Sequence, residues 1–180
     1  MPTYIALLRG INVAGHKPVK MAALAASCEA LGFERVRTYL QSGNVIFAAP
    51  ASAPARLGAR IGERLSRDLG QEMAVLVKPG RDWKAVLDHN PFLTEPATDP
   101  AQLHVTFPFE PPPQSALVKL AVLKTGRDRL ALAHGVIYLH CPEGYGRSKV
   151  SNAILERALG VAATTRNWRT VNELYKLATE

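Results

Sequence analysis

The sequence has few cysteines and no long apolar run. Only Cys28 and Cys141 occur among the 180 residues, and they lie far apart. Two distant cysteines are typical of a reducing compartment and argue against a small disulfide-stapled secreted domain. No apolar run approaches the ~20 residues that cross a bilayer, and the first residues lack the basic start and the cleavage site of a secretion signal. We therefore expect a cytoplasmic protein with no membrane partner.

Signatures of metal binding and of common catalytic machinery are also missing. The five histidines have no zinc-ligand spacing with cysteine, and neither a Ser-His-Asp order nor a Gly-x-Ser-x-Gly elbow occurs. The loop from Gly10 to Gly15 resembles a phosphate loop, but its lysine comes one residue late and Pro18 takes the next place. We therefore predict no metal, no cofactor and no catalytic residue. Whether the protein is an enzyme stays open.

What the sequence does contain is typical of a globular protein with a moderate excess of bases. It is 47% hydrophobic and 21% charged, with a net charge of +7. This charge favours the approach of a polyanion, although many proteins without nucleic-acid partners carry as much. One helical segment has arginines at helical spacing, namely Arg56, Arg60, Arg64 and Arg67. They form either a ridge that meets phosphates or a solvated face, and the solvated face is favoured because charged helix faces are commonplace.

The order of strand and helix patterns predicts an α+β fold with two ferredoxin-like halves of the β-α-β-β-α-β type. In the first half, residues 1–80, we expect strands at residues 3–8, 35–40, 45–49 and 73–78, with helices from near Pro18 and at residues 51–69. The first and third of these strands should pair at the centre of the sheet. The RNA-recognition module has the same order of elements and displays paired aromatic rings on its third strand. Residues 44–47 lack these rings, so the sequence does not match that module.

The second half, residues 100–180, follows a proline-rich connector at residues 81–99. We expect a strand at residues 102–107, a helix at residues 113–123 and a hairpin at residues 128–133 and 136–139. Two helices, at residues 149–159 and from about Thr165 to Ala178, then close the chain. The second half is therefore expected to end in helices and to have no fourth strand.

Polar blocks stand at both of these late helix starts. Ser148 and Thr165 are natural N-caps, each contributing ~1 kcal/mol. Cations oppose the helix dipole at such positions, yet four of them cluster there: Arg147, Lys149, Arg166 and Arg169. This placement indicates either an anionic partner or buried ion pairs, and we weigh the two equally.

Several of these blocks resemble a bacterial family known as domain of unknown function 1697. They are YIALLRGINV at residues 4–13, RTYLQSGNVIF at residues 37–47, NPF at residues 90–92 and TTRNWRTV at residues 164–171. The resemblance covers essentially the whole chain. It implies an α+β protein with ferredoxin-like halves, and it implies no activity, cofactor or catalytic residue.

The leading hypothesis is a protein that binds an anionic ligand, such as a nucleotide or a nucleic-acid phosphate, at a cationic polar site. The predicted ligand-binding residues are Arg9, Asn12, Lys17, Ser42, Asn44, Arg147, Lys149, Arg166 and Asn167. They would converge if the two halves pack against each other. One alternative is a transferase or hydrolase acting on a phosphorylated small molecule, and another is a structural or interaction protein whose polar blocks hold its halves together. The sequence does not indicate an oligomeric state.

Overall fold

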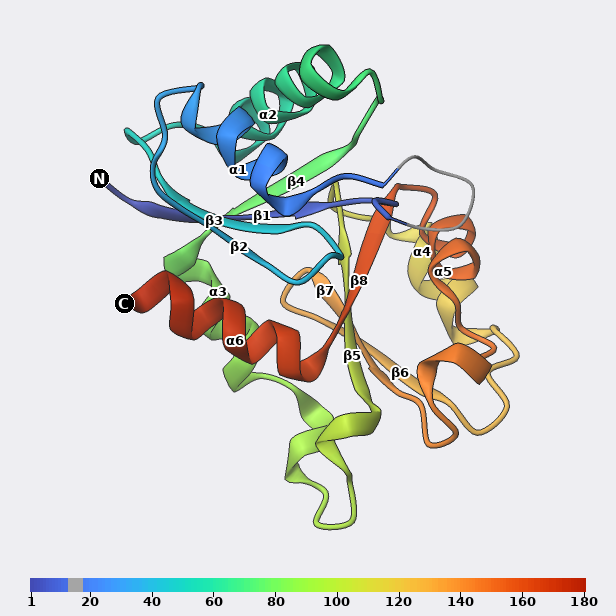
Figure 1. Cartoon of the computed structure of the whole chain (residues 1–180). Helices are drawn as coiled ribbons and strands as arrows, with labels where there is room; N and C mark the ends of the chain where they lie inside the picture. Colours follow the sequence, from blue (N-terminus) through green and yellow to red (C-terminus); the bar gives the residue numbers. More distant parts are fainter. Residues whose placement is uncertain (13–17) are drawn as a thin grey trace. The chain divides into compact units, whose positions relative to one another are not determined.

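The computed structural model describes residues 1–12 and 18–180 (Figure 1). The chain divides into two compact units. The first unit comprises Met1–Lys84 together with Glu173–Glu180, and the second unit comprises Ala85–Asn172. Each unit is described by itself.

The first unit contains one four-stranded antiparallel sheet with the strand order β2-β3-β1-β4. Along the chain the elements are β1 (Thr3–Leu8), α1 (Met21–Glu29), β2 (Glu34–Tyr39), β3 (Asn44–Ala48), α2 (Pro54–Leu69) and β4 (Val75–Pro79). The central strands β1 and β3 pair with Ile5 opposite Ile46. The ferredoxin-like order and the central pairing predicted from the sequence are therefore confirmed for this unit.

Helices α1 and α2 lie on one face of this sheet (Figure 1). Strand residues alternate between faces, so Tyr4, Ala6 and Leu8 point into the core beneath the helices. Close approach of α2 to β4 depends on Gly58, because a Cβ there would lie 2.5 Å from the Val75 carbonyl oxygen. The core below α2 is apolar and tightly packed.

The second unit contains a second four-stranded antiparallel sheet, with the order β6-β7-β5-β8. Its elements are β5 (Leu103–Pro108), α4 (Ser115–Ala121), β6 (Arg129–Ala133), β7 (Val136–His140), α5 (Asn152–Leu159) and β8 (Ala163–Asn167). The α+β class with two ferredoxin-like halves is confirmed. The expected lack of a fourth strand is wrong, because β8 precedes the last helix, α6 (Trp168–Thr179).

The helix starts differ from those expected. Helix α5 is capped by Ser151, whose Oγ accepts from the Ile154 N–H at 3.4 Å, rather than by Ser148. Thr165 lies inside β8, and the Asn167 Oδ1 accepts from the Thr170 N–H at 2.8 Å at the start of α6. Both predicted caps are therefore wrong: the cap of α5 lies three residues later than expected, and the cap of α6 lies two residues later. Each polar block contains several residues that can cap a helix, so the sequence did not show which of them does.

The segment predicted as a connector contains a helix, α3 (Gly80–Asp88), with Trp83 and Val86 buried. A 3₁₀ turn at Pro91–Thr94 follows, and the Asn90 side chain caps it by accepting from the Phe92 N–H at 3.1 Å. Pro91 is therefore the first residue of a turn that follows a regular helix.

Within residues 1–12 and 18–180, no helix combines the length and hydropathy required to cross a bilayer. The same described residues hold no group of three histidine, cysteine or acidic side chains placed to bind a metal ion. Both cysteines are free and buried, and burial, with a smaller effect of Glu29, raises the pKa of Cys28 to about 12. A buried thiol of this kind packs as a small apolar side chain rather than as a nucleophile.

Candidate functional site

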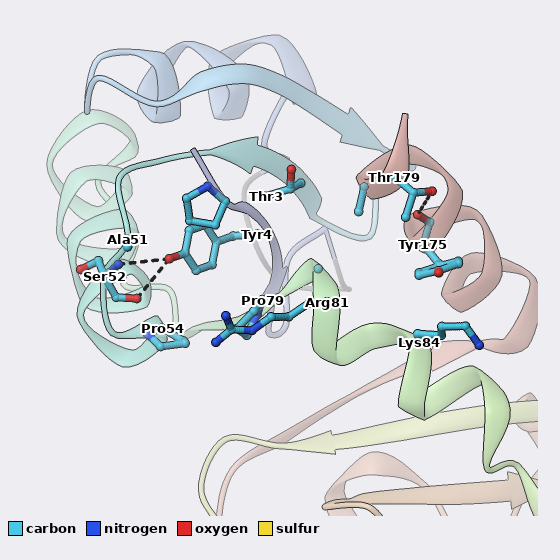
Figure 2. A pocket seen from close by; sticks show the side chains of 13 residues that line it. Thr3, Tyr4, Ala51, Ser52, Pro54, Pro79, Arg81, Lys84, Tyr175 and Thr179 are labelled. Atoms are coloured by element: carbon cyan, nitrogen blue, oxygen red, sulfur yellow. Dashed lines mark hydrogen bonds between the residues drawn. The ribbon is translucent and has the colours of Figure 1, made fainter.

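A cavity of about 460 Å³ opens in the first unit (Figure 2). Four segments distant in sequence form its walls: the start of β1, the loop before α2, the start of α3 and the end of α6. The lining residues are Pro2, Thr3, Tyr4, Ala51, Ser52, Pro54, Pro79, Gly80, Arg81, Lys84, Tyr175, Ala178 and Thr179.

Tyr4 joins the first two walls. Its hydroxyl donates to the Ser52 carbonyl oxygen at 3.2 Å and accepts from the Ser52 N–H at 3.1 Å. Figure 2 shows both bonds, which hold the loop before α2 against β1. Because the phenol group has a donor and an acceptor in use, its buried ring is fixed as one side of the cavity.

Gly80 brings the other two walls close to β1. A Cβ at this position would lie 3.2 Å from the Thr3 carbonyl oxygen and 3.5 Å from the Ala178 Cβ. A side chain at position 80 would therefore crowd the Thr3 carbonyl oxygen of β1, whereas its distance from Ala178 is that of an ordinary contact. The glycine lets the first turn of α3 reach the cavity.

Arg37 of β2 holds the last turn of α6 in place. Its Nη1 donates to the Glu180 Oε2 at 2.6 Å, and its Nη2 donates to the Leu177 carbonyl oxygen at 2.6 Å. This carbonyl belongs to the end of a helix, where no intrahelical donor is available. The wall that carries Tyr175 and Thr179 is thus tied to the sheet of the same unit.

The cavity has a positive electrostatic character. Arg81 and Lys84 lie three residues apart on α3, and no aspartate or glutamate occurs among the described residues that line it. Arg81 makes an ion pair with Asp82 at 3.5 Å, but its side chain is 86% exposed, so this pair neutralises little of its charge. The dipole of α3 places its positive end at the helix start, which lines the cavity.

The residues predicted from the first half lie elsewhere, where β1 ends and β2 turns into β3. The Asn12 Oδ1 accepts from the Val19 N–H at 2.7 Å, and its Nδ2 donates to the Gln41 carbonyl oxygen at 2.7 Å. The Asn44 Nδ2 donates to the Tyr39 carbonyl oxygen at 2.7 Å and to the Ser42 Oγ at 3.0 Å.

The two sequence blocks around Arg9 and Ser42 therefore meet, as the Leu8 N–H bond to the Gly43 carbonyl oxygen at 2.9 Å also shows. The amide groups of Asn12 and Asn44 join backbone segments there. Lys17 lies outside the described residues. Of the predicted residues that the structure describes, none lines the cavity.

The residues predicted from the second half occupy two segments of the second unit. Arg147 and Lys149 are exposed around the turn that precedes α5. Arg166 is buried in β8, where its Nη1 donates to the Thr164 Oγ1 at 2.7 Å and to the Thr165 carbonyl oxygen at 2.9 Å. Burial lowers the pKa of Arg166 to about 10, and Asn167 caps α6. Convergence of these residues with those of the first unit stays a prediction.

Sequence reasoning missed the cavity residues, because α3 was expected to be part of a connector. One signal was present. Trp83, Val86 and Leu87 have the spacing of an amphipathic helix, and Arg81 and Lys84 alternate with them. This pattern indicates a helix with a cationic face, although it says nothing of a cavity.

Comparison with known proteins identifies the family. A family model described as Protein of unknown function (DUF1697) matches residues 1–138, more than half of the chain. The chain belongs to this DUF1697 family. The resemblance inferred from the sequence blocks is therefore confirmed, and the family description assigns no activity. No curated protein matches the chain.

A solved structure has the same fold. It is titled as the structure of the conserved bacterial protein SP0830 from Streptococcus pneumoniae, and it is 22% identical to this chain. The similarity covers 98% of each chain with a TM-score of 0.78. At this identity the likeness establishes the fold alone.

Proposed function

We propose that this protein binds a small anionic molecule, of about the size of a mononucleotide, in the cavity of the first unit. The single observation that carries the proposal is the charge of the lining: Arg81 and Lys84 lie on one helix, and the described lining has no carboxylate. Such a site attracts anions and repels cations, since two cations contribute to its potential and no carboxylate of the described lining opposes them.

The volume and the remaining lining favour a small ligand over a polymer. A cavity of about 460 Å³ lies within the ~300–1,000 Å³ of small-molecule sites. Tyr175 and the prolines provide apolar surface for a ring, whereas Thr3 and Thr179 provide hydroxyl groups. In Figure 2, Lys84 lies on the side of Tyr175 and Arg81 on the side of Pro54. A molecule that joins an anionic group to a planar ring suits both features.

The proposal is tested by thermal melting of the native protein with a series of anions at equal ionic strength. The series contains inorganic phosphate, ribose 5-phosphate, adenosine 5′-monophosphate and small carboxylates, and uncharged adenosine is the control. A ligand present at 100 times its Kd stabilises by about 2.7 kcal/mol, which raises the Tm by roughly 5–10 °C for a chain of this size. A protein whose Tm responds to no anion contradicts the proposal.

Two variants locate the binding. Arg81→Gln and Lys84→Gln should each weaken binding at least tenfold, since hydrogen bonds to charged groups contribute about 1.5–3 kcal/mol. The matched control is Arg127→Gln, which removes one exposed cation of the second unit and should leave the affinity within twofold. Equal weakening by all three variants would show that net charge alone attracts the ligand.

Several residues that the sequence predicted to bind a ligand make contacts that stabilise the fold. Asn12 bonds to the backbone of a distant segment, Asn44 bonds across its own hairpin, and Asn167 caps its own helix. Each of these amides therefore has an architectural role of its own. A ligand role for these residues is therefore a separate prediction from the cavity.

A further inference from the structure

A second cationic surface of the first unit lies on α2, apart from the cavity lining. Arg56, Arg60, Arg64 and Arg67 follow this helix, and a shallow hollow of about 160 Å³ lies among the last three. Leu31 and Glu63 complete the lining of the hollow. Glu63 lines the hollow and Asp68 pairs with Arg64, so the three guanidinium groups still exceed the carboxylates by one charge.

Arg60 is held in position by partners that leave its charge in place. Its Nη2 donates to the Leu31 carbonyl oxygen at 3.2 Å, and its guanidinium lies 5.4 Å from the centre of the Phe33 ring. Both partners are electrically neutral. The side chain is therefore ordered at the surface without being neutralised, in contrast to an arginine of an ordinary solvated face.

Arg64 is oriented by a carboxylate that is itself fixed. Its Nε donates to the Asp68 Oδ2 at 2.7 Å, and the Ser27 Oγ donates to the same oxygen at 2.7 Å. These hydrogen bonds, the one from Arg64 first, hold the pKa of Asp68 below its usual range. Asp68 therefore stays ionised and keeps Arg64 beside Arg60.

We propose that this arginine face of α2 binds the phosphate backbone of a nucleic acid. Arg56 and Arg67 are eleven residues apart, or ~16 Å along a helix. One strand of a duplex carries about five phosphates over this length, at ~3.4 Å each. The arginines of such a ridge, of which Arg60 and Arg64 are held in place, contact successive phosphates without reading the bases, so the binding is independent of sequence.

A membrane surface is the less suitable partner for the same face. Helices that lie in a lipid interface insert large apolar side chains. The large apolar residues that are exposed among the described residues are Met1, Leu40, Leu93, Leu117, Val118 and Val122, and none of them belongs to α2. The chemistry of α2 is therefore that of phosphate contact alone.

The test is fluorescence anisotropy of a labelled 20-base-pair duplex of mixed sequence and of its single strand, titrated with the full chain. The Arg56→Gln/Arg67→Gln variant removes the two arginines at the ends of the ridge, and both are exposed. The control variant, Arg127→Gln/Arg157→Gln, removes two exposed cations from the second unit. Both variants have the same net charge.

We expect the α2 variant to bind at least tenfold more weakly than the native protein. Its plot of log affinity against log salt concentration should be shallower by about 1.8, since each lost phosphate contact removes about 0.9. Arg56→Lys/Arg67→Lys should retain most of the affinity. The control variant should stay within twofold of the native protein.

Three outcomes of the titrations would overturn the proposal: the absence of binding to either nucleic acid at low salt, equal weakening by the two charge-matched variants, and binding to anionic phospholipid vesicles with no binding to nucleic acid. A competition experiment provides a fourth. Adenosine 5′-monophosphate at saturation should not displace the duplex. Displacement would show that both ligands use the cavity and would overturn the assignment to α2.

Discussion

The two units have the same order of strands and helices but stabilise it with different side chains. In each unit the first and fourth strands pair, and the central pair of opposite residues faces the helices. In the first unit this pair is Ala6 and Val77, which are both buried in an apolar core. In the second unit it is Thr106 and Thr165, whose hydroxyl oxygens are 2.8 Å apart, and Thr165 also donates to the Asn152 Oδ1 at 2.9 Å.

The apolar cores of the two units also differ in the side chains that fill them. Tyr4, Phe33 and Phe47 form a stack in the first unit, with ring centres 5.6 and 4.5 Å apart. The helix-facing core of the second unit is mainly aliphatic, with Leu139 and Leu155 among its members. The comparison teaches that this topology accepts either apolar packing or a satisfied polar pair at equivalent places, because both leave no buried polar group without a partner.

The largest expected effect is the loss of the aromatic stack. Phe47→Ala should lower the free energy of unfolding by about 3–5 kcal/mol, because it removes a fully buried ring and leaves a cavity. Denaturant unfolding would measure it as a lower midpoint. Val118→Ala, at a residue 68% exposed, is the control and should change stability by less than ~0.5 kcal/mol. A loss below 1 kcal/mol at Phe47 would mean that the stack contributes little.

The second prediction transfers the chemistry of the second unit into the first. Val77→Thr keeps the shape of the side chain but buries a hydroxyl between Ala6 and the apolar core. An unsatisfied buried hydroxyl costs about 1–3 kcal/mol. The double variant Ala6→Thr/Val77→Thr supplies a partner for it. If the single variant is as stable as the native protein, this core tolerates polar groups and the comparison fails.

The third prediction makes the opposite exchange. Thr165→Val should cost about 1–2 kcal/mol, since it removes a donor to Asn152 and a partner of Thr106. A double-mutant cycle with Thr106→Val measures the coupling, and the double variant should cost less than the sum of the single ones. Strictly additive losses would show that the two hydroxyl groups act independently.

The smallest expected effect is a change in how stability depends on pH. It concerns His140, a residue of the second unit. The His140 Nε2 donates to the Gln102 Oε1 at 2.9 Å, and its Nδ1 accepts from the Arg129 Nη2 at 2.9 Å. Burial first, and then the charge of Arg129, lowers the pKa of His140 below 6.5. As the pH falls below about 6.5, the unfolded chain therefore binds a proton that the folded protein does not, and stability decreases.

His140→Gln should flatten this dependence below pH 6.5 and leave the slope above it unchanged. Unfolding measured across pH would show the difference. His134→Gln, which changes an exposed histidine of the same unit, is the control. An unchanged slope in the His140 variant would mean that another group carries the pH dependence.

The fold was predictable where residue patterns reflect burial directly. Strands β1 and β3 are apolar along most of their length, and each is bounded by turn residues, so the first sheet followed from the sequence. Strand β8 did not, because Thr164, Thr165 and Arg166 have no apolar alternation. Their hydroxyl and guanidinium groups find partners only in the folded unit.

The candidate site was less predictable than the fold. Its lining comes from four segments, and the contacts that join them, such as Gly80 against Thr3, depend on tertiary packing. The arginines of α2 were visible at once, but the carbonyl of Leu31 and the carboxylate of Asp68 that order them were not. The spacing of arginines along the sequence shows which face of a helix they share. It does not show which of their side chains are ordered by contacts with other segments.

The discontinuity of the first unit has a consequence for biosynthesis. Met1–Lys84 leaves the ribosome long before Glu173–Glu180, which completes the same unit. At about 5–20 residues per second, the intervening chain takes roughly 5–20 s to synthesise. During that time β1 to β4 and their helices are available to fold, whereas Tyr175 and Thr179 are still missing from the cavity wall. The strands of the first unit are therefore all synthesised early, whereas the wall of its cavity is complete only after α6 has been made.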